Sequence, residues 1–169
     1  MKIAFDLDDT LLPHMQDFTT EASAIPLASR CLPIWRLRLG TRQLILELQD
    51  QGHEVWIYTR SQRSQSMIFW MFLLNGMRLQ GIVNDRRHHL AIKTQPRELQ
   101  LCFKLPPMFG IDILFDDAAY VRDAGITADF RVVQVNPHNP QWSSQVKESI
   151  EELKAAKTLE ATPAARAPR

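Results

Sequence analysis

Three short apolar runs in this sequence each stop abruptly at acidic or hydroxyl residues, and this feature constrains the fold most. Each run has the length and the β-branched or aromatic content of a buried strand. Because polar residues follow at once, each strand is predicted to end in a polar turn. The runs are Lys2-Ile3-Ala4-Phe5 before Asp6-Leu7-Asp8-Asp9-Thr10, Val55-Trp56-Ile57-Tyr58 before Thr59, and Ile111-Asp112-Ile113-Leu114-Phe115 before Asp116-Asp117.

Helices are predicted between these strands. Thr41 is expected to cap one that ends before Gly52, and Ser61 one whose segment 67–74, with Trp70, is apolar all round, as in a helix buried in the core. The polar stretch 84–100 is assigned to the surface. Weaker strands are predicted at Gly81–Val83 and 131–135, and a last helix from Ser143 or Ser144 with Val146, Ile150 and Leu153 in one stripe.

Strands that alternate with helices predict an α/β fold: a Rossmann-like three-layer sandwich, with a mostly parallel sheet, helices on both faces and no full cap domain. We expect a single domain over residues 1–157. Segment 14–40 has no sustained period and is expected to form at most a small flap, and residues 158–169 are expected to be a disordered tail. In such a sheet the ligand site lies outside the carboxyl ends of the strands, where the polar residues collect.

Charge and composition exclude several classes of protein. The 169 residues have a formal net charge of +1, so bulk electrostatic capture of nucleic acid is not expected. No apolar run reaches the ~18 residues of a membrane helix, and the first residues do not resemble a signal peptide, so a cytoplasmic protein is expected. Cys31 and Cys102 form no Cys-x-x-Cys pair, so neither a disulfide framework nor a structural zinc site is predicted.

The charges are nevertheless segregated along the chain. Residues 1–29 carry one Lys and five acids, residues 30–104 carry twelve basic and five acidic residues, and residues 105–169 carry seven and nine. If the acidic ends met at a metal and the basic middle surrounded them, the site would attract a phosphorylated ligand. The alternative is scattered, solvated surface charge.

The order of these motifs resembles the haloacid dehalogenase (HAD) superfamily, specifically its phosphatases of minimal, capless type. The family's first motif, Asp-x-Asp-x-Thr after a strand, is matched by Asp6, Asp8 and Thr10. The Ser or Thr of its second motif is matched by Thr59. Its third and fourth motifs, a Lys and then acidic residues at the end of a strand, are matched by Lys104 and by Asp116-Asp117.

The resemblance implies a Mg²⁺-dependent phosphomonoester hydrolase. Asp6 would be the nucleophile that forms an aspartyl-phosphate, and Asp8 the general acid and base. Thr59, Arg60 and Lys104 would bind the phosphoryl group. The metal would take oxygen ligands from Asp6, from Asp8 through its backbone carbonyl, and from Asp116 or Asp117.

Purely structural roles remain open for several of these residues. Asp9 and Thr10 are also good turn or cap formers, and one of Asp116 and Asp117 is expected to act indirectly. Lys93 competes with Lys104 for the third motif. The pair His88-His89 lacks the spacing for joint metal ligation, and we expect it to bind no metal.

Two other functions fit the same fold: a phosphotransferase, and a catalytically silent domain that binds phosphate or a partner protein. An open site with a basic surround favours a large phosphorylated substrate, such as a nucleotide, a nucleic-acid end or a phosphoprotein. No membrane partner is expected, and formation of an oligomer is left open because a neighbouring subunit could cover the site.

Overall fold

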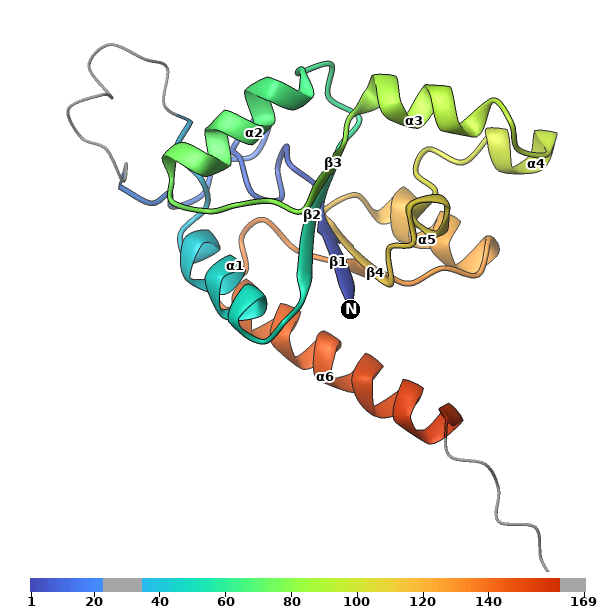
Figure 1. Ribbon diagram of the computed structural model, residues 1–169. Coiled ribbons are helices and arrows are strands. Elements are labelled where there is room, and N and C mark those ends of the chain that lie inside the picture. Colours follow the sequence, from blue (N-terminus) through green and yellow to red (C-terminus); the bar gives the residue numbers. More distant parts are fainter. Residues whose placement is uncertain (23–34, 162–169) are drawn as a thin grey trace, which may run out of the picture.

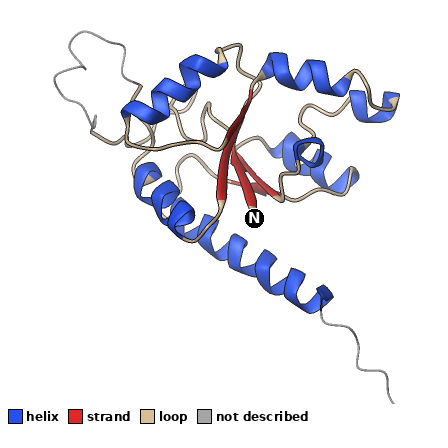
Figure 2. Ribbon diagram, in the orientation of Figure 1, coloured by secondary structure: helices blue, strands red, loops and turns tan. Residues whose placement is uncertain are grey.

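The computed structural model of the chain, which describes residues 1–22 and 35–161, has a sheet between two layers of helices (Figures 1 and 2). The strands pair in parallel in the order β3-β2-β1-β4-β5. The predicted α/β fold with a parallel sheet is confirmed. The strands are β1 (Lys2–Phe5), β2 (Glu54–Tyr58), β3 (Gly81–Val83), β4 (Ile113–Asp116) and β5 (Val132–Gln134).

The helices lie on both faces of the sheet, as the alternation of strand residues requires. Ile3 and Phe5 of β1 face α1, α2 and α6, whereas Ala4 faces the side of α5. None of the helices among the described residues is long and apolar enough to cross a membrane. The helices are α1 (Thr41–Asp50), α2 (Gln65–Leu74), α3 (Asp85–Ile92), α4 (Arg97–Gln100), the 3-10 helix η2 (Pro106–Phe109), α5 (Ala119–Thr127) and α6 (Trp142–Ala161).

Helix α2 is not buried all round, which corrects the prediction from its composition. Ile68, Met71 and Phe72 are at most 1% exposed, but Phe69 and Trp70 on other faces are 37% and 54% exposed. A single helix that covers one side of a sheet presents only one stripe to it, whatever the composition of the remaining faces. Its cap is Ser64, which accepts a hydrogen bond from the Met67 N–H, rather than Ser61.

Four helices were absent from the sequence prediction: α3, α4, η2 and α5. Helix α3 lies in the polar stretch 84–100, and Asn84 caps it by accepting from the Arg87 N–H. Helix α5 begins after Ala118, which offers no capping side chain, and contains Gly125. That glycine is required by packing, because a Cβ atom there would lie 2.7 Å from the Phe130 carbonyl oxygen.

The ends of helices α1 and α6 also differ from the prediction. Thr41 is the first residue of α1 rather than its cap, and the preceding Gly40 has a positive φ of 88°. Helix α6 begins at Trp142 and continues past Lys157 to Ala161, because the Lys, Leu and Glu residues there are strong helix formers. Residues 23–34 of the expected flap and 162–169 of the expected tail lie outside the described residues.

Buried Arg38 ties the end of the expected flap to the loop before α6. Its Nη2 donates to the carbonyl oxygens of Asn136, Pro137 and Asn139 at 2.8 to 2.9 Å. Its guanidinium also lies over the ring of Trp142, 4.7 Å from the centroid. Burial lowers the pKa of Arg38 to about 10, which still leaves it charged at neutral pH.

Candidate active site

The predicted site residues follow three neighbouring strands. β1 lies between β2 and β4, so the chain leaves the sheet in opposite directions on its two sides, which is where open α/β sheets bind ligands. The Asp6 N–H continues the ladder to the Phe115 carbonyl at 2.8 Å, and the Thr59 N–H bonds the Val83 carbonyl at 2.8 Å. Asp6, Thr59 and Asp116 therefore gather at one edge of the sheet.

Lys104 joins the first and fourth motifs. Its Nζ lies 2.7 Å from Asp6 Oδ1 and 2.6 Å from Asp116 Oδ2, and its side chain is 2% exposed. Among the described residues, Lys104 is the one cation that contacts Asp6 Oδ1. The competing Lys93 is exposed at the end of α3. The structure thus brings Lys104, and not Lys93, to Asp6.

The electrostatics of this group show a shortage of positive charge. Burial and the nearby Asp116 raise the pKa of Asp6, although Lys104 opposes both effects. Burial alone would lower the pKa of Lys104, but Asp6 and Asp116 outweigh it and raise the value, so the ammonium stays charged. One lysine in direct contact with two buried carboxylates leaves negative charge that is not compensated.

Asp116 and Asp117 differ in how their oxygens are used. Asp116 is buried, with Oδ2 on Lys104 and Oδ1 accepting from the Ala118 N–H at 2.9 Å. Asp117 accepts from the Thr10 hydroxyl through Oδ1 at 2.9 Å, and its N–H donates back to Thr10 at 3.1 Å. No donor among the described residues reaches Oδ2 of Asp117, so this oxygen is free to bind a ligand. Burial also raises the pKa of Asp117.

Three carboxylates form a group that fits a divalent cation. Ligand oxygens of Asp6, Asp116 and Asp117 all lie within 4.8 Å of one another. Oxygen donors in this number suit Mg²⁺, which keeps several waters beside one or two carboxylates. Both oxygens of Asp116 already accept, from Lys104 and from the Ala118 N–H, whereas Oδ2 of Asp117 has no donor among the described residues.

Asp8 lies outside that group. Its two carboxylate oxygens contact Nη1 of Arg63 at 2.7 and 2.8 Å, and the same nitrogen donates to Ser61 Oγ at 2.7 Å. Arg63 therefore orients Asp8. The sequence analysis placed Arg63 only within a basic region, and its position four residues after Thr59 was the one available signal.

Thr59 and Arg60 have separate surroundings. Thr59 is 1% exposed, and its hydroxyl oxygen accepts from the Ser61 N–H at 3.1 Å, which leaves the hydroxyl hydrogen available to a phosphoryl oxygen. Arg60 instead donates to Asp85 at 2.7 Å and to the Phe103 carbonyl at 2.6 Å. Its guanidinium is thus already held by protein groups, and its expected role at the phosphate stays a prediction.

A buried polar pair supports the segment that carries Lys104. The Tyr58 hydroxyl contacts His88 Nδ1 at 2.6 Å and accepts from the Leu105 N–H at 2.8 Å. Burial, with the nearby charge of Arg60, lowers the pKa of His88 to about 4, so its ring is neutral and accepts a hydrogen bond from the Tyr58 hydroxyl. His88 is therefore part of the core, and sequence reasoning gave no sign of its link to Lys104.

Asp9 and Thr10 organise the turn after β1. Asp9 has a positive φ of 58°, and its Oδ1 accepts from the N–H groups of His14, Met15 and Gln16 at 2.8 to 3.0 Å. Thr10 is fully buried against Asp117. The turn role considered for Asp9 is the one that its contacts support.

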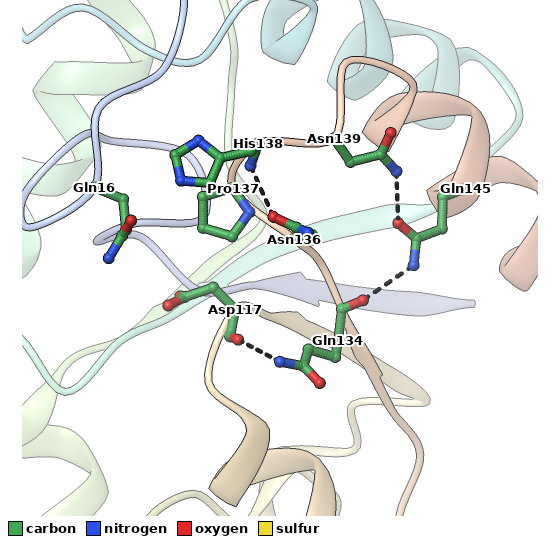
Figure 3. A pocket seen from close by; sticks show the side chains of 8 residues that line it. All are labelled: Gln16, Asp117, Gln134, Asn136, Pro137, His138, Asn139 and Gln145. Atoms are coloured by element: carbon green, nitrogen blue, oxygen red, sulfur yellow. Dashed lines mark hydrogen bonds between the residues drawn. The ribbon is translucent and has the colours of Figure 1, made fainter.

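Asp117 also borders a polar hollow of about 770 Å³ (Figure 3). Most of its amide side chains bond one another or the backbone: Gln134 donates to the Asp117 carbonyl, and Gln145 donates to the Gln134 carbonyl, each at 3.0 Å. Gln134 thus holds the backbone of Asp117 in place. Because these donors are already used, the side chains that line the hollow offer few groups to a ligand.

Comparison with known proteins finds a likeness in structure and none in sequence. No protein-family model matches the sequence, and none of the curated proteins matches it significantly. Among solved structures, the chain is similar to a HAD-superfamily hydrolase of subfamily IA, variant 1, from Geobacter sulfurreducens, at 16% identity and a TM-score of 0.49. The likeness covers 82% of this chain and 91% of that one.

Proposed function

We propose that this protein is a Mg²⁺-dependent phosphomonoester hydrolase of HAD type. The carrying observation is the group of Asp6, Asp116 and Asp117 around the buried Lys104, at the carboxyl edge of the sheet. A phosphate monoester repels anionic nucleophiles, so its hydrolysis needs a positioned nucleophile, donors for the phosphoryl oxygens and added positive charge.

The residues of the chain divide the reaction into two steps. A carboxylate oxygen of Asp6 attacks phosphorus as the bond to the ester oxygen breaks, and Asp8 gives that oxygen a proton. The resulting aspartyl-phosphate is then hydrolysed by a water that gives its proton to Asp8, which releases inorganic phosphate and restores Asp6. Thr59 donates to a phosphoryl oxygen, and Lys104 holds Asp6 in position.

The carboxylate group supplies the expected metal ligands. Asp6, Asp117 and the backbone carbonyl of Asp8 would hold Mg²⁺, and Asp116 would fix Lys104 beside them. The bound ion would neutralise charge between the carboxylates and the phosphoryl oxygens. This assignment explains why the structure leaves negative charge on Asp6 and Asp117 without enough cations of its own.

Release of phosphate from p-nitrophenyl phosphate, with Mg²⁺ and with a chelator, tests this proposal. Turnover that needs Mg²⁺ but no acceptor other than water supports a hydrolase. Turnover only with an added alcohol acceptor would indicate a phosphotransferase, and no turnover under either condition would indicate a silent binding domain.

A second measurement tests the metal without turnover. Saturating Mg²⁺ at about 100 times its Kd is expected to raise the unfolding free energy by about 2.7 kcal/mol. Asp117→Asn should remove most of this increase, whereas Asp112→Asn, a matched change at the other end of the sheet, should keep it. Equal increases in both variants would contradict the proposed ligands.

A further inference from the structure

Phe103 and Tyr120, named here the aromatic wall, form an aromatic pair on the segments that carry Lys104 and Asp117. The ring centroids lie 5.1 Å apart with an interplanar angle of 83°. Phe103 immediately precedes Lys104, and Tyr120 lies in the first turn of α5, after Asp117. Two rings that are far apart in sequence are thus brought together by the same segments that carry the catalytic residues.

The aromatic wall is exposed although it is rigidly supported. Phe103 is 40% exposed and Tyr120 is 57% exposed. The Arg60 guanidinium lies over the Phe103 ring at 4.7 Å, and Arg60 also holds the Phe103 carbonyl through a hydrogen bond of 2.6 Å. Arg60 is itself fixed by Asp85. The protein therefore keeps Phe103 in one place without burying it.

Tyr120 lies in the first turn of α5, three residues after Asp117, and the carboxylate charges influence its hydroxyl. Partial burial raises the pKa of Tyr120, and the charges of Asp116, Asp6 and Asp117 act in the same direction, against Lys104. The phenol stays neutral at physiological pH. Among the described residues its hydroxyl has no hydrogen-bond partner, so both its ring and its hydroxyl face solvent or a ligand.

From these contacts we infer that the aromatic wall binds a planar aromatic ring in the leaving group of the substrate. Aromatic rings attract one another in stacked and edge-to-face arrangements beyond the effect of buried area alone. The inference rests on the proposed function, since it names the substrate class of that site. The ring can belong to a nucleobase or to another arene close to the ester oxygen, and the two are separated by the substrates below.

Two matched pairs of substrates test the inference. Benzyl phosphate and cyclohexylmethyl phosphate are both esters of primary alcohols and differ in the aromaticity of the ring. A nucleoside 5′-monophosphate and ribose 5-phosphate share the reacting group and differ by the base. We expect kcat/KM to favour the aromatic member of at least one pair by about tenfold, mainly through KM. Preference in the benzyl pair alone indicates an arene next to the ester, and preference in the nucleotide pair indicates a base.

Variants assign the preference to the aromatic wall. In Tyr120→Leu and Phe103→Leu the ratio of kcat/KM within the preferred pair should fall to about 1, whereas Trp70→Leu, at an equally exposed ring on α2, should keep the wild-type ratio. Equal kcat/KM within both pairs in the wild type would overturn the inference. So would a ratio that survives in the Tyr120 and Phe103 variants.

Failure of the proposed function gives a different result. If the wild type hydrolyses no ester, the hydrolase proposal fails, and calorimetry with benzylphosphonate and cyclohexylmethylphosphonate decides the binding question. Tighter binding of the benzyl compound that is lost in Tyr120→Leu supports the aromatic wall. Equal binding of the two compounds overturns it.

Discussion

At the amino end of β4, Asp112 is fully paired, whereas at the carboxyl end of the sheet Asp6 and Asp116 share a single lysine and Asp117 has none. Asp112 accepts the Lys2 N–H at 2.7 Å and pairs with Lys157. Although burial opposes them, these partners lower the pKa of Asp112. The pKa values of Asp6 and Asp117 move in the opposite direction.

The difference shows how one residue type serves two purposes in one sheet. At the amino end, aspartate charge is balanced by the chain's own cations and the contact is structural. At the carboxyl end, the charge exceeds what the contacting cation can balance, which is unfavourable for folding and suits the capture of a divalent ion. The following variants test this contrast, from the largest expected effect to the smallest.

Asp6→Asn is expected to lower kcat by at least about 10⁴-fold, because the amide keeps the shape of the side chain but removes the nucleophile. Its unfolding free energy should stay equal or rise, since one uncompensated charge leaves the buried group. Asp8→Asn should also cripple turnover. Phosphatase assays and thermal unfolding measure both effects, and Asp6→Asn activity within a few-fold of wild type would disprove the mechanism.

Lys104→Met is expected to lower kcat by about 10² to 10³-fold, the usual loss for one electrostatic group at a reacting oxygen. It should also destabilise the fold by about 3–5 kcal/mol, because it leaves Asp6 and Asp116 buried without a cation. Lys93→Met is the control and should change neither value appreciably. A larger loss of activity in the Lys93 variant would show that the assignment of the third motif is wrong.

The lowered pKa of His88 is expected to reduce the free energy of unfolding at low pH. Its pKa of about 4 in the folded chain lies below the unfolded value of 6.5, so the unfolded chain takes up the proton first as the pH falls. The contribution of His88 to the free energy of unfolding should be fully present above pH 6.5 and decline by up to about 3 kcal/mol between pH 6.5 and 4.

The variant His88→Gln isolates this contribution. Glutamine can still accept from Tyr58 but does not titrate, so urea unfolding across this range should show a smaller decline than in the wild type. Buried His53, whose pKa is also lowered by burial, contributes to the decline that remains. An identical pH profile in His88→Gln and wild type would rule out His88 as a source of the effect.

Asp112→Asn is expected to have the smallest effect. The Lys157 partner is about half exposed, and ion pairs of this kind contribute about 1 kcal/mol or less. Turnover should stay at the wild-type level because Asp112 lies at the opposite end of the sheet. A large loss of activity would show that the two ends of the sheet are energetically coupled.

The strands, and the position of the acidic residues at their carboxyl ends, could be predicted from local sequence. An apolar run that stops at Asp or Thr is typical of a buried strand that ends in a polar turn. Helix α5 could not be recognised, since Ala118 gives no cap signal and Gly125 is a poor helix former that packing requires. The exposed face of α2 could not be predicted either, because the composition of a helix does not show how much of it the sheet covers.

The site shows the same division. The types of residue in the motifs and their order indicated Asp6, Lys104 and the acidic pair. The contacts of Arg63 with Asp8 and of Tyr58 with His88 join residues 55 and 30 positions apart, and only the packing of the folded chain brings these residues together. The proposed choice of Asp117 over Asp116 as metal ligand rests on which oxygens already accept a hydrogen bond, which the sequence does not show.

The strand order has a consequence for biosynthesis. β1 emerges from the ribosome first but lies in the middle of the sheet, with β2 on one side and β4 on the other. β2 can pair with it early, whereas its second edge stays open until β4 has been made, and Thr10 meets Asp117 across 107 positions. One edge of β1 therefore keeps unpaired N–H and C=O groups until β4 has been made, and such an edge can pair with other chains during folding.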